Sequence, residues 1–290
     1  MLISKTDYSN QFTLTLCCDD KPGIVAATAT ELAATGANII ESSQFWDQDS
    51  NQFFMRISFT TTEEVKRSRI EKALKPVVDR FGMKTHLVDQ TETPNILIMV
   101  SKFDHALLHL LYQVKVGWLP AKVAAIVSNH TDAQKIADQE GIPFYHIPVT
   151  RDTKAAKEEQ LLQIARDSDV DLVVLARYMQ VLSDKFSTRL FGKIINIHHS
   201  FLPSFKGAKP YHQAYDRGVK LIGATAHYVT PDLDEGPIIE QETSRISHSF
   251  SATELVAEGR DIESRVLARA VKLHLESRVM LNGHKTVVFA

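Results

Sequence analysis

Residues 194–198 read Ile-Ile-Asn-Ile-His, a short apolar run that ends in polar residues. Such a run is typical of a strand buried in a parallel sheet, which brings polar side chains to the carboxyl edge where open α/β folds bind ligands. Asn196 and His198 are two residues apart, so on a strand they share one face, whereas Ile195 and Ile197 point into packing. The run therefore favours an α/β fold with a site beside His198.

The chain from residue 95 onward alternates strand-like and helical segments. Helical spacing is clear at Leu107, Leu110 and Val114. The segments with strand patterns are 95–101, 122–128, 171–176, 193–196 and 221–229. This alternation predicts a doubly wound, mostly parallel sheet with helices on both faces. We expect residues 251–282 to be mostly helical, with Gly259 as a break.

The first 88 residues predict a smaller, separate domain. Strand patterns at 12–18, 37–45, 53–59 and 83–88 enclose helical patterns at 24–35 and 62–81. This order gives a βαββαβ, ferredoxin-like unit. Residues 89–94 are polar, end in proline and lack periodicity, so they predict a linker to a second domain at 95–290.

Composition limits the classes of partner. The 33 Lys and Arg residues nearly balance the 35 Asp and Glu residues, so charge gives no case for nucleic acid as the main partner. No apolar run approaches the about 18 residues that span a bilayer, so we expect no membrane insertion. Cys17 and Cys18 are adjacent in a strand-like run and should point to opposite faces, which argues against a disulfide between them. These features fit a reducing compartment, so we expect a cytoplasmic location.

Asn196, His198 and Asp234 are the candidates for chemistry. His198 alone could be a packed structural histidine, but it ends a buried strand and shares its face with Asn196. Asp234 alone would be a solvated carboxylate, but it follows the strand at 221–229 in a loop that contains Pro231, Gly236 and Pro237. An amide donor, an imidazole and a carboxylate together suit the addition of water or an amine to a carbonyl carbon.

Two motifs in this region resemble the signature of the formyltetrahydrofolate transferase and hydrolase superfamily. They are Asn196-Ile197-His198 with Ser200 and Leu202-Pro203, and Leu233-Asp234-Glu235-Gly236-Pro237. The resemblance covers about 95–241 and implies that Asn196, His198 and Asp234 form the catalytic group. Asn196 and protonated His198 would stabilise the oxyanion, and Asp234 would orient the attacking water and take up its proton.

The same resemblance implies a folate pocket. Its walls would be Tyr178, Met179, Gln180, Val181 and Leu182 on one side and Thr230 to Asp234 on the other. His227 resembles a family position that lines this site, although a merely packed imidazole is the alternative. Tyr178 and Met179 have the corresponding alternative of core filling.

No cofactor is implied, because the folate is the substrate. Dinucleotide and phosphate-loop fingerprints are missing from the sequence, as are the His-Glu-x-x-His and paired-Cys motifs of zinc sites. The adjacent His198 and His199 should point apart on a strand.

The segment Ser101-Lys102-Phe103-Asp104-His105 bears on the acceptor. Glycinamide ribonucleotide transferases of the superfamily have a glycine-containing loop here that binds the acceptor's phosphate, and Phe103 and Asp104 replace small residues. This departure, the wording of residues 198–205 and the fused N-terminal domain together resemble the superfamily's deformylases, in which water is the acceptor. This implies hydrolysis of 10-formyltetrahydrofolate to formate and tetrahydrofolate, with a place in one-carbon balance and formate supply for purine synthesis. The alternatives are a glycinamide ribonucleotide formyltransferase with a regulatory extension and a non-catalytic amino-acid sensor.

The segment Cys18–Val25, Cys-Asp-Asp-Lys-Pro-Gly-Ile-Val, resembles the opening of an ACT domain, although Asp-Lys-Pro-Gly alone is a generic turn. The resemblance implies control by an amino-acid effector, with methionine and glycine as candidates. A small sheet of this kind has exposed edges, so we expect a homo-oligomer.

Overall fold

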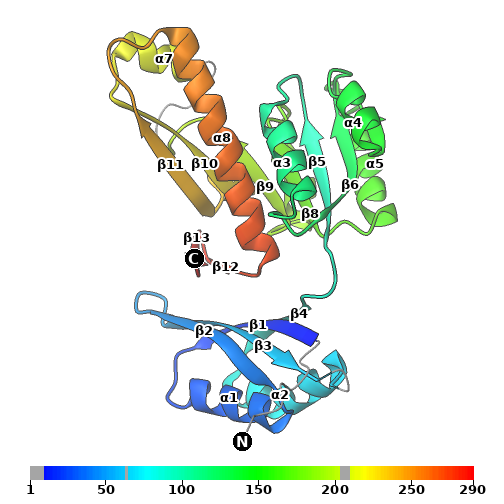
Figure 1. Ribbon diagram of the computed structural model, residues 1–290, viewed down its shortest axis with the longest axis vertical. Helices are drawn as coiled ribbons and strands as arrows, with labels where there is room; N and C mark the ends of the chain where they lie inside the picture. The colour runs from blue at the N-terminus through cyan, green and yellow to red at the C-terminus, as the bar shows by residue number, and fades with distance from the viewer. Residues whose placement is uncertain (1–9, 63–64, 203–209) are drawn as a thin grey trace, which may run out of the picture. The chain divides into compact units, whose positions relative to one another are not determined.

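The computed structural model describes residues 10–62, 65–202 and 210–290, which form two compact units (Figure 1). The first unit contains residues 10–93 of the described chain together with 276–280 and 287–290, and the second contains 94–275 and 281–286. The change of unit after residue 93 falls inside the expected linker, 89–94. The end of the chain is divided between the units, whereas the sequence prediction placed all of 95–290 in the second domain.

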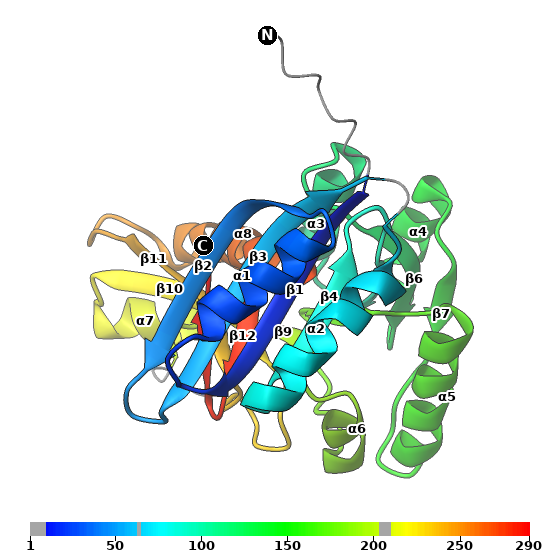
Figure 2. The same cartoon turned by 90° about the horizontal axis from the view of Figure 1, so that it is seen from below.

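The N-terminal unit has the expected βαββαβ order. Its elements are β1 (Asn10–Asp19), α1 (Ile24–Ala34), β2 (Asn38–Asp47), β3 (Gln52–Thr61), α2 (Arg67–Phe81) and β4 (Lys84–Asp89). The four strands form one sheet in the order β2-β3-β1-β4, and every neighbouring pair is antiparallel. The two helices cover the same face of this sheet (Figure 2).

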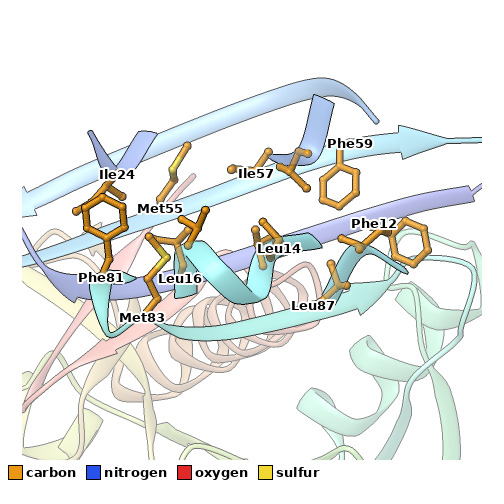
Figure 3. Close-up of a cluster of buried hydrophobic side chains, with 14 of the residues drawn as sticks. Phe12, Leu14, Leu16, Ile24, Met55, Ile57, Phe59, Phe81, Met83 and Leu87 are labelled. Carbon is orange, nitrogen blue, oxygen red and sulfur yellow. The ribbon is translucent and has the colours of Figure 1, made fainter. Parts of the chain in front are cut away.

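The core of this unit lies between the sheet and its helices. Leu14 and Leu16 of β1 and Met55, Ile57 and Phe59 of β3 are each at most 1% exposed. They occupy alternate positions along their strands, as the period of two predicts, and Figure 3 shows them with side chains from both helices. Each such side chain contributes about 1.5–3 kcal/mol to folding through burial.

The opposite face of the same sheet meets the end of the chain. Phe54 packs with Val287 and Phe289. The buried guanidinium of Arg56 donates to Glu41 Oε2 at 2.9 Å and to the carbonyl oxygen of Glu276. The C-terminal residues thus complete the N-terminal unit.

We expected residues 251–282 to be mostly helical, but the helix ends at Leu275. Helix α8 spans Ala252–Leu275, and the following residues form a hairpin of β12 (Val279–Asn282) and β13 (Lys285–Val288). These strands are too short to show a period. Gly259 does not break the helix, contrary to the prediction. A Cβ at Gly259 would overlap the ring of Tyr211, so the glycine permits a close approach between α8 and that ring.

The second unit is an α/β fold around a seven-stranded sheet. Its further elements are β5 (Asn95–Val100), α3 (His105–Lys115), β6 (Lys122–Ser128), α4 (Gln134–Glu140), β7 (Phe144–His146), α5 (Lys154–Asp167), β8 (Leu172–Ala176), α6 (Asp184–Arg189), β9 (Ile194–His198), α7 (Pro210–Arg217), β10 (Leu221–Tyr228) and β11 (Ile238–Arg245). The strand order is β11-β10-β9-β8-β5-β6-β7. Strands β5 to β9 are mutually parallel, which confirms the prediction of a mostly parallel sheet.

Strands β10 and β11 depart from the parallel arrangement. β10 runs antiparallel to β9, with His227 opposite Asn196 and Thr225 opposite His198. β10 therefore ends beside the first residues of β9, and the loop that follows must fold back for Asp234 to reach His198. The sequence does not reveal this reversal, because a parallel and an antiparallel buried strand have the same residue pattern.

No helix of the described residues is long and apolar enough to cross a bilayer. Of the motif residues, Pro203 and Ser204 lie outside the part of the chain that the structure describes.

Candidate active site

One face of the β9–β10 pair carries the polar residues of the site. Asn196 and His198 alternate along β9, and Thr225 and His227 alternate along β10 directly opposite them. Because directly opposed residues of an antiparallel pair share a face, all four side chains lie on the same side of the sheet. The sequence predicts the shared face only for Asn196 and His198 on β9. That Thr225 and His227 lie on the same face depends on the register between β9 and β10.

Asp234 makes a hydrogen bond with His198. Its Oδ1 lies 3.2 Å from His198 Nδ1 and 3.9 Å from His227 Nε2, and His198 is 5% exposed. The hydrogen bond from His198 lowers the pKa of Asp234 and outweighs burial, which opposes ionisation. Asp234 is therefore a carboxylate at neutral pH. Both contacts use Oδ1.

Asn196 and His227 fix each other's orientation. His227 Nδ1 donates to the backbone oxygen of Tyr228 at 2.9 Å, so Nε2 accepts from Asn196 Nδ2 at 3.2 Å. Burial lowers the pKa of His227, which favours this neutral tautomer. The amide of Asn196 keeps a second N–H for a ligand. His198 Nε2 is also buried and has no hydrogen-bond partner in the described part of the chain.

The loop that carries Asp234 has a constrained backbone. Asp234 has φ 59°, a left-handed conformation that costs a residue with a Cβ free energy. A Cβ at Gly236 would overlap the backbone oxygen of Tyr228, and Tyr228 N donates to Pro237 O at 2.9 Å. These contacts close the loop beside the end of β10 and explain the Asp-Glu-Gly-Pro sequence.

The segment after β9 is anchored by residues that the sequence reasoning missed. Thr225 Oγ1 accepts from Leu202 N at 3.0 Å and donates to Ser200 O at 3.0 Å. Gln241 Nε2 donates to Thr225 Oγ1 at 2.9 Å and to Leu202 O at 3.2 Å. The only signal for Thr225 was its position two residues before His227, which places it on the same face of a strand.

The two adjacent histidines do not point apart as expected. The rings of His198 and His199 stack with centroids 4.9 Å apart. β9 ends at His198, so the alternation of a strand no longer governs His199.

A pocket of about 270 Å³ opens beside these residues. The structure brings all the sequence-predicted site residues together in its lining: Asn196, His198, Asp234, His227, Thr230, Tyr178, Met179, Gln180, Val181 and Leu182. Met179 and Val181 are 54% and 56% exposed, so they provide an apolar wall. Tyr178 and Leu182 are buried and belong to the core as well, in line with the core alternative for Tyr178. Burial raises the pKa of Tyr178 to about 12.

The arrangement is an apolar pocket with an amide, an imidazole and a carboxylate at one end, which suits attack on a polarised carbonyl carbon. Among residues 10–62, 65–202 and 210–290, no three His, Cys, Asp or Glu side chains are grouped to hold a metal ion. The fold, and a family model that covers more than half of the chain, place it in the formyl transferase class. The formyl transferase family model matches residues 94–271.

Relatives that match nearly the whole chain show which family within this class it belongs to. A formyltetrahydrofolate deformylase of a Corynebacterium species is 46% identical over 276 residues, which cover 95% of this chain and 96% of the relative. The crystal structure of a formyltetrahydrofolate deformylase from Burkholderia mallei is 50% identical, covers 97% of this chain and 100% of its own, and superposes with a TM-score of 0.93. The chain belongs to the formyltetrahydrofolate deformylase family.

A glycinamide ribonucleotide transformylase from Symbiobacterium toebii is more distant. Its structure is 28% identical, has a TM-score of 0.65, and covers 71% of this chain and 98% of its own. The transferase alternative therefore corresponds to a distant relative that matches part of this chain.

Proposed function

We propose that this protein hydrolyses 10-formyltetrahydrofolate to formate and tetrahydrofolate. The observation that carries the proposal is the group of Asn196, His198 and Asp234 at the end of an apolar pocket. Membership of the deformylase family gives independent support. The product would supply formate for purine biosynthesis and adjust the one-carbon pool, as the sequence resemblance implies.

In the proposed reaction, water forms a bond to the formyl carbon and the bond from that carbon to the folate nitrogen breaks. Oδ2 of Asp234 orients the water and takes up its proton, which is then delivered to the leaving nitrogen. The free N–H of Asn196 and Nε2–H of protonated His198 donate to the oxygen of the tetrahedral intermediate. Each such donor can contribute about 3 kcal/mol to the transition state.

Contacts around the loop after β5 favour water as the acceptor. Phe103 in this loop lies under two guanidinium groups, 4.9 Å from that of Arg260 and 5.8 Å from that of Arg177. His105, the first residue of α3, is 2.9 Å from a carboxylate oxygen of Glu263. The side chain at the start of α3 is therefore already paired with an internal carboxylate and is not free for a phosphate.

The test is to incubate the purified protein with 10-formyltetrahydrofolate, with and without glycinamide ribonucleotide, and to follow formate and tetrahydrofolate. We expect formate to appear at the same rate in both samples. Turnover that strictly requires the ribonucleotide would replace the hydrolase by the transferase.

We also propose that the N-terminal unit is an ACT-like regulatory domain with methionine or glycine as effector. Its βαββαβ order and a hollow lined by Asp20, Lys21, Gly23, Ile24, Val25, Ala26 and Phe53 support this. Each amino acid should be titrated against formate release and against the melting temperature. If neither amino acid changed the rate of formate release or the melting temperature, the proposal of an effector would be wrong.

We further propose that the protein forms a cytoplasmic homo-oligomer and that its subunits associate through β2. β2 is an edge strand, and Ile40, Phe45 and Trp46 on it are 59%, 46% and 45% exposed. Ile40→Lys in the full chain should lower the mass measured by light scattering, with exposed Lys72→Glu on α2 as control. A mass that Ile40→Lys leaves unchanged would exclude this edge.

A further inference from the structure

The wall of the pocket at residues 178–182 is a loop between β8 and α6 without helix or strand of its own. All five residues line the pocket, and two of them, Met179 and Val181, are more than half exposed. A loop with exposed apolar side chains keeps one shape only when contacts outside it hold its backbone, because an unheld loop regains conformational entropy. Three sets of contacts hold this one.

The loop starts from a strained residue that is paired with a buried carboxylate. Arg177 has φ 64°, and its Nε lies 3.3 Å from Oε2 of Glu263, which is 1% exposed on α8; this contact is an ion pair without hydrogen-bond geometry. The same carboxylate accepts hydrogen bonds from Tyr211 Oη at 2.6 Å and from His105 Nε2 at 2.9 Å. Burial opposes ionisation of Glu263, but these hydrogen bonds and the charge of Arg177 outweigh it and lower its pKa.

The loop ends at a second buried carboxylate. Ser183 N donates to Oε1 of Glu158 at 2.7 Å, and Ser183 Oγ donates to the other oxygen, Oε2. Glu158 is 8% exposed on α5. Ser183 Oγ also accepts from Phe186 N at 3.2 Å and so caps α6. One carboxylate therefore fixes both the last loop residue and the start of the next helix.

The middle of the loop is held by a hydroxyl. Met179 N donates to Ser101 Oγ at 2.9 Å, and Ser101 Oγ donates to Asn129 Oδ1 at 2.6 Å. Ser101 is the residue after β5 and is 3% exposed. This contact ties the loop to the neighbouring strand.

Glu158 and Glu263 are the buried carboxylates of the described ranges, and both hold the same loop. Burying a carboxylate costs several kcal/mol unless it is fully paired, so neither position is explained by core stability alone. We infer that Glu158 and Glu263 are positioning residues that fix the two ends of the pocket loop and so preform the binding wall. The expected change in KM rests on the proposed function, because it assumes that the loop binds the folate.

The first arm of the test measures hydrogen exchange of the loop amides, which requires no turnover. Glu158→Ala should speed exchange about tenfold at Ser183 and the residues just before it, because a hydrogen bond to a charged group is lost. Glu158→Gln keeps an oxygen for Ser183 N and should restore most of the protection. Glu159→Ala, which removes an exposed neighbour on α5, is the matched control and should change nothing in the loop.

Glu263→Gln should speed exchange at the other end of the loop, near Arg177 to Met179, with Glu258→Gln on the same helix as control. The two ends therefore respond to different variants. Unchanged loop exchange in both Glu158→Ala and Glu263→Gln would overturn the inference, as would acceleration spread evenly over all strands, which a general loss of stability produces.

The second arm measures kinetics with 10-formyltetrahydrofolate. For Glu158→Ala we expect KM to rise about tenfold while kcat stays within about threefold, because a disordered wall weakens binding in ground and transition state alike. A fall in kcat with unchanged KM would contradict a positioning role. If the wild-type protein released no formate, the proposed function would fail, whereas the exchange measurements would still decide whether the carboxylates hold the loop.

Discussion

In the N-terminal unit, the face of β1 and β3 beneath the two helices carries Phe, Leu, Ile and Met side chains, whereas in the second unit the pocket face of β9 and β10 carries Asn, His and Thr. The buried Arg, Glu and His residues of the described ranges fall mostly in the second unit. Arg56 lies in the first unit, and Glu158, His198, His227 and Glu263 lie in the second. Since buried polar groups cost free energy unless they are paired, the second unit retains them for binding and chemistry. Substitutions in the first unit should therefore change stability, and those at the pocket should change turnover.

The largest expected effect is on turnover, for Asp234→Asn. Asparagine tolerates the left-handed backbone at this position, but it cannot take a proton from water. We expect kcat to fall by about 10²–10⁴ while the folate still binds. Glu235→Gln, an exposed neighbour, is the control. Near-normal kcat in Asp234→Asn, with a change in stability of at most about 1 kcal/mol, would mean that Asp234 only shapes its loop.

The opposite pattern is expected for Phe59→Ala. Phe59 is fully buried and its ring lies 5.8 Å from that of Phe12. The free energy of unfolding should fall by about 3–5 kcal/mol, the range for removing a buried aromatic side chain. Below the melting temperature, kcat per folded molecule should stay within about twofold. A loss of kcat in the folded protein would break the division between the units.

Asn196→Ala should lower kcat by about 10²–10³, the effect of removing one oxyanion donor. Combined with Asp234→Asn, the loss should be smaller than the product of the two single losses, because both residues act on one transition state. Strictly multiplicative losses would indicate that the two residues act in separate steps.

These residues also show how far the sequence could predict the structure. Asn196 and His198 could be predicted to share a face, because side chains two residues apart on one strand point to the same side of the sheet. Thr225 and His227 meet them only through the antiparallel register of β10, which no local pattern encodes. Glu158 and Glu263 look like any charged helix residue in sequence, since burial depends on neighbours from distant segments. The five residues 178–182 were found by resemblance, and no periodicity marks them.

The smallest effect concerns pH. Burial lowers the pKa of His227, so the unfolded chain takes up a proton near the ordinary value of about 6.5 while the folded protein resists it. The stabilising contribution of this neutral histidine is present above that pH and is lost as the pH falls through the lowered folded value. In His227→Gln, the free energy of unfolding should therefore fall less between pH 7.5 and pH 5 than in the wild type. Identical slopes would show that His227 does not titrate in this way.

The most direct test of the central claim follows the oxygen atoms of the product. The protein is incubated with 10-formyltetrahydrofolate in water enriched in oxygen-18, without any amine, and the formate is examined by mass spectrometry. If Asp234 directs water to the formyl carbon, each formate carries one solvent oxygen, and Asp234→Asn forms labelled product at the reduced rate given above. Absence of formate until an amine acceptor is added, or recovery of the formyl group on that amine, would contradict the account.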